Sequence, residues 1–223
     1  MMKDIFDFLK ELREHNERDW FNAHKAQYTK LKAEFEGFVE ELIGKITLFD
    51  EEVRGLAVKD CVYRIYRDTR FSPNKTPYKT HFAAYIAAFQ GRNSQRAGYY
   101  VHLEPGGSLL GGGLYCPEPP VLKRVRQDIY DNISEFLSII RNEAFRKEFS
   151  ELDDTDKLKR VPFPFPADFP EGDLLKHKHY DVVSYKPDEF FFHPDAGDRI
   201  AEVFRKLQPF NRFLNYTVDD AGE

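Results

Sequence analysis

The sequence has few cysteines and no long apolar run. These two absences argue against a disulfide-rich secreted protein and against a membrane-spanning protein. Cys61 and Cys116 are its only cysteines, too few for a disulfide framework, so we expect reduced thiols on strands of a cytoplasmic protein. No run of about 18 apolar residues occurs, so the sequence predicts no membrane span. The N-terminal stretch also lacks the continuous apolar centre of a secretion signal and follows a helical period instead.

Repeats and low-complexity tracts are also missing, which argues against solenoids and disordered linkers. The chain has 223 residues, enough to bury a core without staples. We expect a single α+β domain over residues 1–223, with an antiparallel β-meander covered by N-terminal and C-terminal helices. In this prediction residues 1–50 are helical, 58–118 hold the sheet and a basic loop, and 119–223 form a helical C-terminal part.

Apolar residues at helical spacing predict the helices. They indicate one helix over residues 3–14 and a longer one over about 18–48, with Asn16 as a plausible N-cap between them. The helical period returns after Pro120, and a final helix is expected after Asp195.

Alternating and β-branched residues predict the strands. We interpret Cys61–Arg67 as a strand and "THFAAYIAAF" as a second, although its alanines leave a helix open. "YYVHLE" and "SLLGGGLYCP" read as a hairpin turning at Gly106 and Gly107, which completes a meander of about four strands. "HYDVVSYKP" is typical of one more strand near the C-terminus.

Positive charge is concentrated in one short segment of an acidic chain. The formal net charge is −5, yet residues 59–81 carry six basic and two acidic residues, or +4, which leaves −9 elsewhere. Duplex nucleic acid needs an extended basic face, so this distribution disfavours nucleic acid as a partner. A confined basic patch suits a small anion better, through arginine forks and lysine point charges.

The predicted strand places the basic residues on two faces. Arg64 and Tyr66 would share one face, and Tyr63, Ile65 and Arg67 the other. Because Ile65 and Tyr63 are expected to face the core, the Arg64 face is the expected wall of a site. Pro73 and Pro77 would stiffen the loop that follows. A solvated loop with weak surface ion pairs is the alternative.

The segment "RIYRDTRFSPNKTPYKTHFAAY" closely resembles the signature of the family catalogued as domain of unknown function 2461. "NERDWFNAHKAQY", "GYYVHLEPGGSLLGGGLYCP" and "LKRVPFPFP" resemble its other blocks, so the match extends over most of the chain. The family has no assigned activity. The resemblance therefore implies which residues are functional but not what reaction or ligand they serve. The functional residues it implies are Arg64, Arg67, Asp68, Arg70, Lys75, Tyr78 and Lys79.

Two other motifs were weighed. His177, His179 and Asp181 would point the same way on a strand, which is metal-ligand spacing, but Val182 stands where the related hydrolase motif has a histidine. An exposed strand face is favoured there, and no metal site is predicted. "GGSLLGGG" lacks the lysine of a phosphate-binding loop, so its glycines are expected to allow close approach of another backbone.

The sequence therefore supports two hypotheses. The first is a site for a phosphorylated or polycarboxylate small molecule at the basic loop, where His81, His24 or Asp68 are candidates for acid–base chemistry. The alternative is a module that uses the same loop to bind a protein or nucleic acid. Neither the cofactor, the reaction nor the oligomeric state follows from the sequence.

Overall fold

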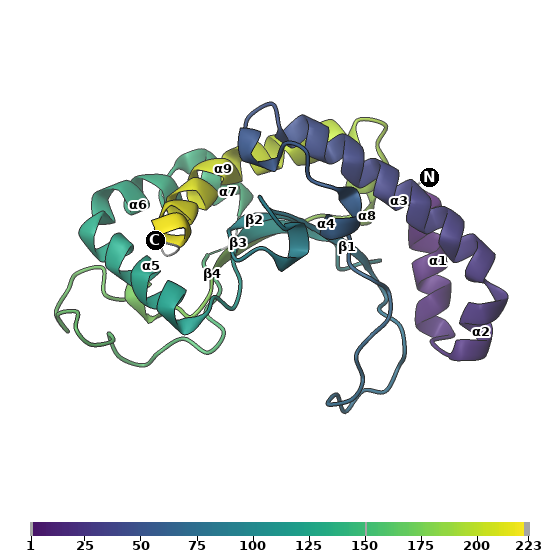
Figure 1. Cartoon of the computed structure of the whole chain (residues 1–223), viewed down its shortest axis with the longest axis horizontal. Helices are drawn as coiled ribbons and strands as arrows, with labels where there is room; N and C mark the ends of the chain where they lie inside the picture. The colour runs from purple at the N-terminus through teal and green to yellow at the C-terminus, as the bar shows by residue number, and fades with distance from the viewer. Residues whose placement is uncertain (1, 150, 221–223) are drawn as a thin grey trace. The chain divides into compact units, whose positions relative to one another are not determined.

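The computed structural model describes residues 2–149 and 151–220 and confirms the α+β class. Its four-stranded antiparallel sheet has the order β1-β2-β3-β4, with helices before and after it in the chain (Figure 1). No helix in the described residues combines the length and apolarity needed to cross a membrane. Contacts divide the chain into two compact units, and β2 and β3 contribute residues to both.

The first unit comprises Met1–Asn93, Tyr100–Leu110 and Tyr185–Glu202. Its α-helices are α1 (Met2–Glu14), α2 (Arg18–Ala23), α3 (Lys25–Ile46), α4 (Val58–Cys61), α8 (Asp188–Phe192) and the start of α9 (Ala196–Asp220). It also holds the 3-10 turns η1 (Glu51–Val53) and η2 (Gly91–Asn93), strand β1 (Phe82–Ile86), most of β2 (Gly98–Leu103) and the start of β3 (Leu109–Leu114).

The second unit comprises Ser94–Tyr99, Gly111–Ser184 and Val203–Glu223. It contains α5 (Pro119–Asp131), α6 (Ile133–Ile140), α7 (Glu143–Glu148), η3 (Leu174–Lys176), most of β4 (Tyr180–Tyr185) and the rest of α9.

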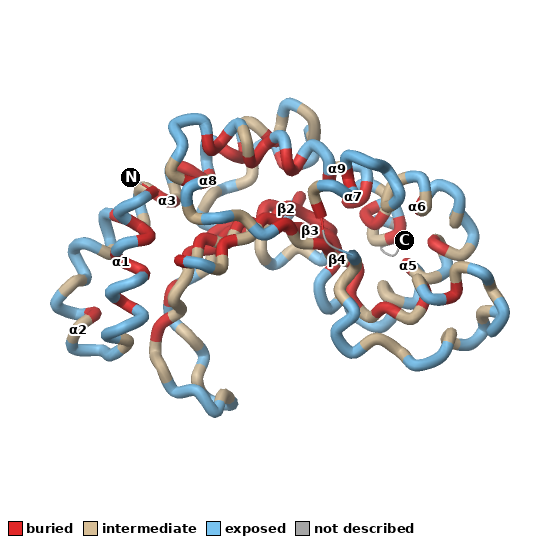
Figure 2. Tube along the Cα trace, turned by 180° about the vertical axis from the view of Figure 1, so that it is seen from behind, coloured by how far each residue is buried: buried red, intermediate tan, exposed pale blue. Residues whose placement is uncertain are grey.

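Each unit buries the apolar stripe of its helices (Figure 2). In the first unit, Ile5 and Leu9 of α1 are fully buried, as the spacing predicts. Phe35 of α3 contacts Phe82 of β1, with ring centroids 5.4 Å apart. Aromatic pairs of this kind stabilise a core beyond the area they bury.

The predicted helix over residues 18–48 is interrupted. His24 leaves the helical region with φ −102° and ψ 12°, so α2 ends before it and α3 begins after it. Its ring nitrogen also bonds the carbonyl of Trp20. Asn16 is not the N-cap that the sequence suggests, because its side chain bonds elsewhere and Glu17 occupies that position.

The prediction of a regular strand over Cys61–Arg67 is wrong. Cys61 ends helix α4, and the segment after it pairs only through the isolated bridges Val62–Ala84 and Tyr66–Tyr78. Pro77 accepts a bond from the Arg67 N–H but has no N–H to return, so a continuous ladder cannot form. Residues 62–81 instead form an extended double strand that leaves the sheet, here called the arm (Figure 1).

The side chain of Asn16 holds the arm by bonding both backbone groups of Tyr78, as a neighbouring strand would. The Asn16 amide donates to the Tyr78 carbonyl over 3.0 Å, and its oxygen accepts from the Tyr78 N–H over 3.1 Å. The ring of Tyr78 stacks on Phe21 at 4.0 Å between centroids. These contacts attach the arm to the junction between α1 and α2.

The remaining strand predictions fare better. "THFAAYIAAF" contains β1, a strand and not a helix, and the hairpin of β2 and β3 turns at Gly106 with φ +74°. The last predicted strand is β4, and it supplies the fourth sheet position beside β3. Neither cysteine lies on a strand: Cys61 ends α4, and Cys116 follows β3 with φ +51°.

The glycines of β3 allow close backbone approach, as expected. A Cβ on Gly112 would collide with the Gly98 carbonyl oxygen and would lie 2.6 Å from Leu207 Cδ2. Asn211 of α9 donates to that same Gly98 carbonyl over 2.9 Å. The glycines therefore serve packing in the second unit and are not a phosphate-binding loop.

Candidate functional site

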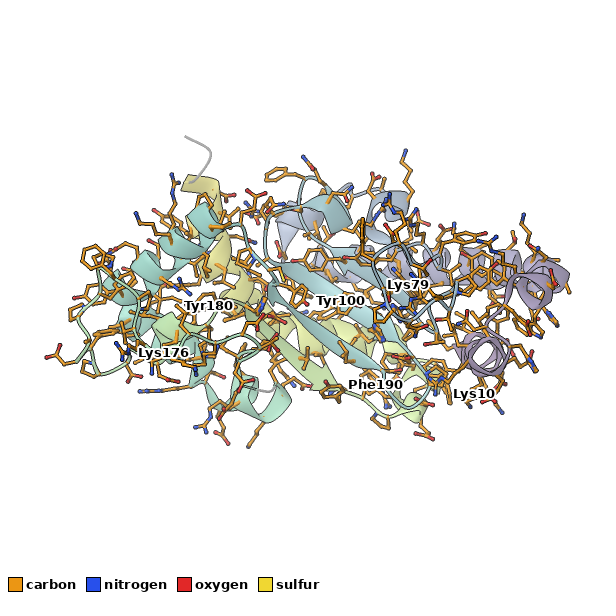
Figure 3. The ribbon with its side chains drawn as sticks, turned by 90° about the horizontal axis from the view of Figure 1, so that it is seen from below. Lys10, Lys79, Tyr100, Lys176, Tyr180 and Phe190 are labelled. Carbon is orange, nitrogen blue, oxygen red and sulfur yellow. The ribbon has the colours of Figure 1, made fainter. Side chains whose placement is uncertain are left out.

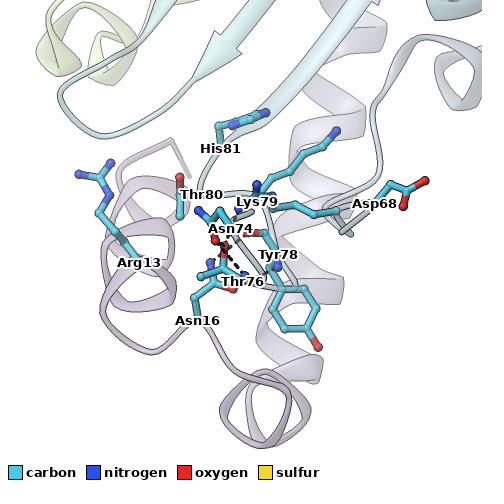
Figure 4. Close-up of a pocket in the computed structure, with 10 residues that line it drawn as sticks. Arg13, Asn16, Asp68, Asn74, Thr76, Tyr78, Lys79, Thr80 and His81 are labelled. Atoms are coloured by element: carbon cyan, nitrogen blue, oxygen red, sulfur yellow. Dashed lines mark hydrogen bonds between the residues drawn. The ribbon is translucent and has the colours of Figure 1, made fainter. Parts of the chain in front are cut away.

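A polar cavity of about 600 Å³ opens between the arm and the end of α1, all within the first unit (Figure 4). The proline-containing arm supplies most of its wall, while Arg13 and Asn16 come from the α1–α2 junction. Its lining residues are Arg13, Asn16, Arg67, Asp68, Asn74, Thr76, Tyr78, Lys79, Thr80 and His81.

The residues implied by the sequence divide between this cavity and the outer surface of the arm. Those that line it are Arg67, Asp68, Tyr78 and Lys79, whereas Arg64, Arg70 and Lys75 are exposed and do not. The expected wall of Arg64 and Tyr66 is not the wall of this cavity. The predicted alternation itself holds, because Ile65 is buried and Arg67 half-buried while Arg64 and Tyr66 are exposed. What differs is the face that carries the cavity, which is that of Arg67.

Two of the three outer cations, Arg70 and Lys75, have partners within the arm. Arg70 pairs with Asp68 over 2.7 Å, and Lys75 donates to the Thr69 carbonyl over 2.8 Å. The hydrogen bonds from Arg70 lower the pKa of Asp68 to about 2. Asp68 therefore stays ionised and directs its charge to Arg70, at the edge of the cavity.

Arg67 and Lys79, the two cations of the arm that line the cavity, have only neutral partners, whereas Arg13 lies 3.8 Å from Glu104. The Arg67 guanidinium donates to Thr76 Oγ1 over 2.5 Å and approaches Ser72 Oγ at 3.5 Å. The Lys79 ammonium lies 5.1 Å from the centre of the Tyr63 ring. Within residues 2–149 and 151–220, no carboxylate forms a salt bridge with Arg67 or Lys79. Burial, and secondarily the charge of Arg64, lowers the pKa of Lys79.

A second polar feature adjoins the cavity at His81. His81, His102 and Glu104, here called the β2 cluster, each offer a ligand atom within 4.8 Å of the others. His102 Nε2 lies 3.0 Å from Glu104 Oε2, and the rings of His81 and His102 are 4.2 Å apart. Tyr100 continues the chain of contacts, with its hydroxyl 2.9 Å from His102 Nδ1. Figure 3 labels Tyr100 on its strand and Lys79 on the arm.

The protonation states of this region follow from burial. Burial, with His102 as the next cause, lowers the pKa of His81 to about 4, so its imidazole is neutral at neutral pH. Burial alone would raise the pKa of Glu104, but hydrogen bonds from His102 and Thr80 outweigh it and lower that pKa. Burial raises the pKa of the Tyr100 phenol. The region thus presents a neutral imidazole, a carboxylate and a phenol together.

Sequence reasoning missed the β2 cluster, although a signal was present. Tyr100, His102 and Glu104 occupy alternate positions, so they lie on one face along β2 and its end. His81 is the last residue of the arm, directly before β1, and is brought to them by the pairing of β1 with β2. His24, by contrast, bonds the Trp20 carbonyl and does not line the cavity.

The second unit contains a related group, Asp153, His179 and Asp181, here called the β4 cluster. His177, expected to share its face, instead bonds the Asp153 carbonyl through Nδ1 over 2.7 Å. His179 Nδ1 accepts from the Cys116 N–H over 3.0 Å. In the described residues Asp181 Oδ1 is buried without a hydrogen-bond partner. Burial, and then the charge of Asp153, raises the pKa of Asp181 to about 7.

These features define an α+β protein with a cationic cavity formed by a proline-containing arm. The family model described as "Conserved hypothetical protein (DUF2461)" matches residues 4–213, and the chain belongs to that family. Neither curated proteins nor solved structures gave a match.

Proposed function

We propose that this protein binds a small anionic molecule, phosphorylated or polycarboxylate, in the cavity beside the arm. The observation that carries the proposal is that Arg67 and Lys79 line this cavity without a carboxylate partner in the described residues. Positive charges held close together and half-buried repel each other, and a bound anion would relieve that repulsion.

The chemistry and size of the cavity support a metabolite-sized ligand. A guanidinium fork recognises two oxygens of a phosphate or carboxylate at once, and an ammonium adds a compact charge. A volume of about 600 Å³ lies within the usual range of small-molecule sites. Free thiols at Cys61 and Cys116 are compatible with the cytoplasmic location that forms part of this proposal.

The alternative function uses the outer surface of the arm to bind a macromolecule. Phe71 is 93% exposed, and the Arg70 guanidinium lies 5.8 Å from the centre of its ring. An exposed aromatic residue beside an arginine is a frequent feature of protein interfaces. Duplex nucleic acid remains the less favoured partner, because the chain outside residues 59–81 carries −9.

A pair of double variants separates the two functions. Phosphate or citrate should raise the melting temperature of the wild type, since a ligand at a hundred times its Kd stabilises by about 2.7 kcal/mol. The change Arg67→Ala with Lys79→Ala should abolish this shift. The matched control, Arg70→Ala with Lys75→Ala, removes the same charge from the same arm and should keep it. Equal responses of the two double variants would contradict the proposal.

A further inference from the structure

The β2 cluster has the donor set of a transition-metal site. Two imidazoles and one carboxylate converge from two segments of the first unit, with their ligand atoms within 4.8 Å of one another. This combination leaves coordination positions open for water or substrate when it holds an ion. Imidazole nitrogen and carboxylate oxygen suit Zn²⁺, Fe²⁺, Co²⁺ and Mn²⁺ better than they suit a soft, sulfur-preferring ion.

We propose that His81, His102 and Glu104 bind one divalent first-row transition-metal ion at the margin of the arm cavity. His81 lines this cavity, so an ion held there would border the space in which a small molecule can lie.

The spacing requires only a modest side-chain adjustment. Ligands about 2.1 Å from a tetrahedral ion stand roughly 3.4 Å from one another. His102 Nε2 and Glu104 Oε2, at 3.0 Å, are already close to that separation. The largest separation in the cluster is below 4.8 Å, so rotation of the half-buried His81 ring toward the pair would complete the set.

The outer partners of the two β2 ligands match those of established metal sites. When His102 Nε2 binds an ion, Nδ1 must carry the proton, and the Tyr100 hydroxyl oxygen 2.9 Å away can accept it. Glu104 has its other oxygen, Oε1, held by the Thr80 hydroxyl over 2.9 Å. His102 and Glu104 are therefore each oriented by a hydroxyl group, and Arg13 lies 3.8 Å from the same oxygen of Glu104.

The β4 cluster has similar residues but the wrong outer partner. The Cys116 N–H can only donate, so His179 Nδ1 must accept and cannot carry a proton. In the neutral ring the proton then lies on Nε2, which removes the lone pair that an ion would need. This difference gives the metal proposal a built-in comparison within one chain.

Charge predicts that the metal and an anion bind cooperatively. Glu104 contributes one negative charge, which Arg13 already faces at 3.8 Å, while Arg67 and Lys79 line the same cavity as His81. A divalent ion therefore leaves the region more positive, and an anion in the cavity would offset that charge. This cooperativity rests on the proposed function, whereas metal binding itself does not.

Cobalt absorption tests the site directly. The full-length protein is treated with a chelator, dialysed without phosphate and titrated with Co²⁺. A His-ligated ion should give visible d–d absorption that saturates at one equivalent and is displaced by Zn²⁺. Absence of saturable absorption, or saturation only at a large excess of cobalt, would overturn the proposal.

Variants assign the absorption to residues. His102→Gln and His81→Gln should each weaken Co²⁺ binding at least 100-fold, and Tyr100→Phe by roughly 10–100-fold as an outer partner. The matched controls are His179→Gln in the β4 cluster and His193→Gln on the surface, and both should bind as the wild type does. Circular dichroism establishes whether each variant is folded. If a variant of a ligand residue does not fold, Tyr100→Phe tests the site in its place. An absorption that survives His102→Gln and disappears with His179→Gln would refute the assignment.

A final titration separates this inference from the proposed function. Phosphate should tighten Co²⁺ binding in the wild type and not in Arg67→Ala with Lys79→Ala, because coupling between two ligands is reciprocal. Cobalt binding that is tight but indifferent to phosphate would support the metal site while contradicting the cooperativity. The thermal-shift experiment with phosphate alone judges the anion site independently.

Discussion

The β2 and β4 clusters contain the same kinds of residue and differ in what surrounds them. In the β2 cluster, the outer atoms of His102 and Glu104 meet hydroxyl groups, which can donate or accept. In the β4 cluster, His179 meets a backbone N–H, which can only donate, and Asp181 Oδ1 has no partner in the described residues.

The comparison shows that an inventory of ligand-type side chains does not define a site. The His102 Nε2–H donates to Glu104, and the Tyr100 hydroxyl can either donate to Nδ1 or accept from it, so the proton can lie on Nδ1 when an ion replaces the bond to Glu104. The amide partner fixes the His179 ring in one tautomer. The unsatisfied carboxylate beside it stores unfavourable energy that the protein relieves by holding a proton, as the raised pKa of Asp181 indicates.

The largest expected effect is a loss of stability at the packing glycines of β3, which lie outside both clusters. Gly112→Ala should destabilise the protein by about 3 kcal/mol or more, because the new methyl group meets a backbone carbonyl that cannot move aside. Gly44→Ala in α3 is the control, since nothing lies within 4 Å of its Cβ position, and alanine there should stabilise by up to about 1 kcal/mol. Denaturant melts measure both, and a loss below about 1 kcal/mol for Gly112→Ala would show that β3 yields easily.

A smaller effect should separate the β4 cluster from the β2 cluster by pH. The pKa of Asp181 is about 7 in the folded protein against 3.8 for an ordinary aspartate, so the folded state holds an extra proton between these values. Its contribution to stability is complete below about pH 4 and is lost as the pH rises through 7. Asp181→Asn should remove this loss and stabilise the protein at pH 8, relative to pH 4, by on the order of 1–3 kcal/mol.

The measurement for Asp181 is a series of denaturant melts from pH 4 to pH 8 with a chelator present. Asp154→Asn, a change at an exposed carboxylate in the same segment as Asp153, is the control and should leave the pH profile unchanged. Parallel profiles for the wild type and Asp181→Asn would mean that water or a shifted side chain already satisfies this carboxylate.

The smallest effect concerns the outer shell of the β2 cluster. Thr80→Val keeps the shape of the side chain and removes its hydrogen bond to Glu104, which should cost about 1 kcal/mol of stability. Thr29→Val, whose hydroxyl bonds its own exposed helix, should cost less. If the two variants melt alike, Thr80 does not hold Glu104 in place, and the contrast between the clusters is weaker than the distances indicate.

Much of the fold was accessible from the sequence because its signals are local. The period of α1 and the glycine turn at Gly106 depend on neighbouring residues, and both predictions are confirmed. The break at His24 was missed because the apolar stripe continues across it, and the period cannot register one residue leaving the helical region. The segment Cys61–Arg67 has the alternation of a strand because alternation indicates extended backbone. It does not indicate whether the neighbouring segment has the N–H groups needed for a continuous ladder.

Only part of the candidate site can be predicted from the sequence, because the rest depends on residues that are distant along the chain. The arm is recognisable in the sequence as a local concentration of positive charge, but which of its two faces borders a cavity depends on the α1–α2 junction, which is distant in sequence. Tyr100, His102 and Glu104 were visible as an alternating set, yet their meaning depends on His81, which is adjacent only in space. Asp153 has no signal in the sequence, since the segment between it and His179 has only the short 3-10 turn η3 among its described residues.

The pairing of Asn16 with Tyr78 has a consequence for how the molecule behaves in a crowded solution. A two-stranded ribbon has outward-facing N–H and C=O groups, and an exposed ribbon edge recruits strands from other molecules. At Tyr78 both outward groups are already occupied by one amide side chain. Asn16 thus occupies, at Tyr78, the edge groups through which a strand of another molecule would pair.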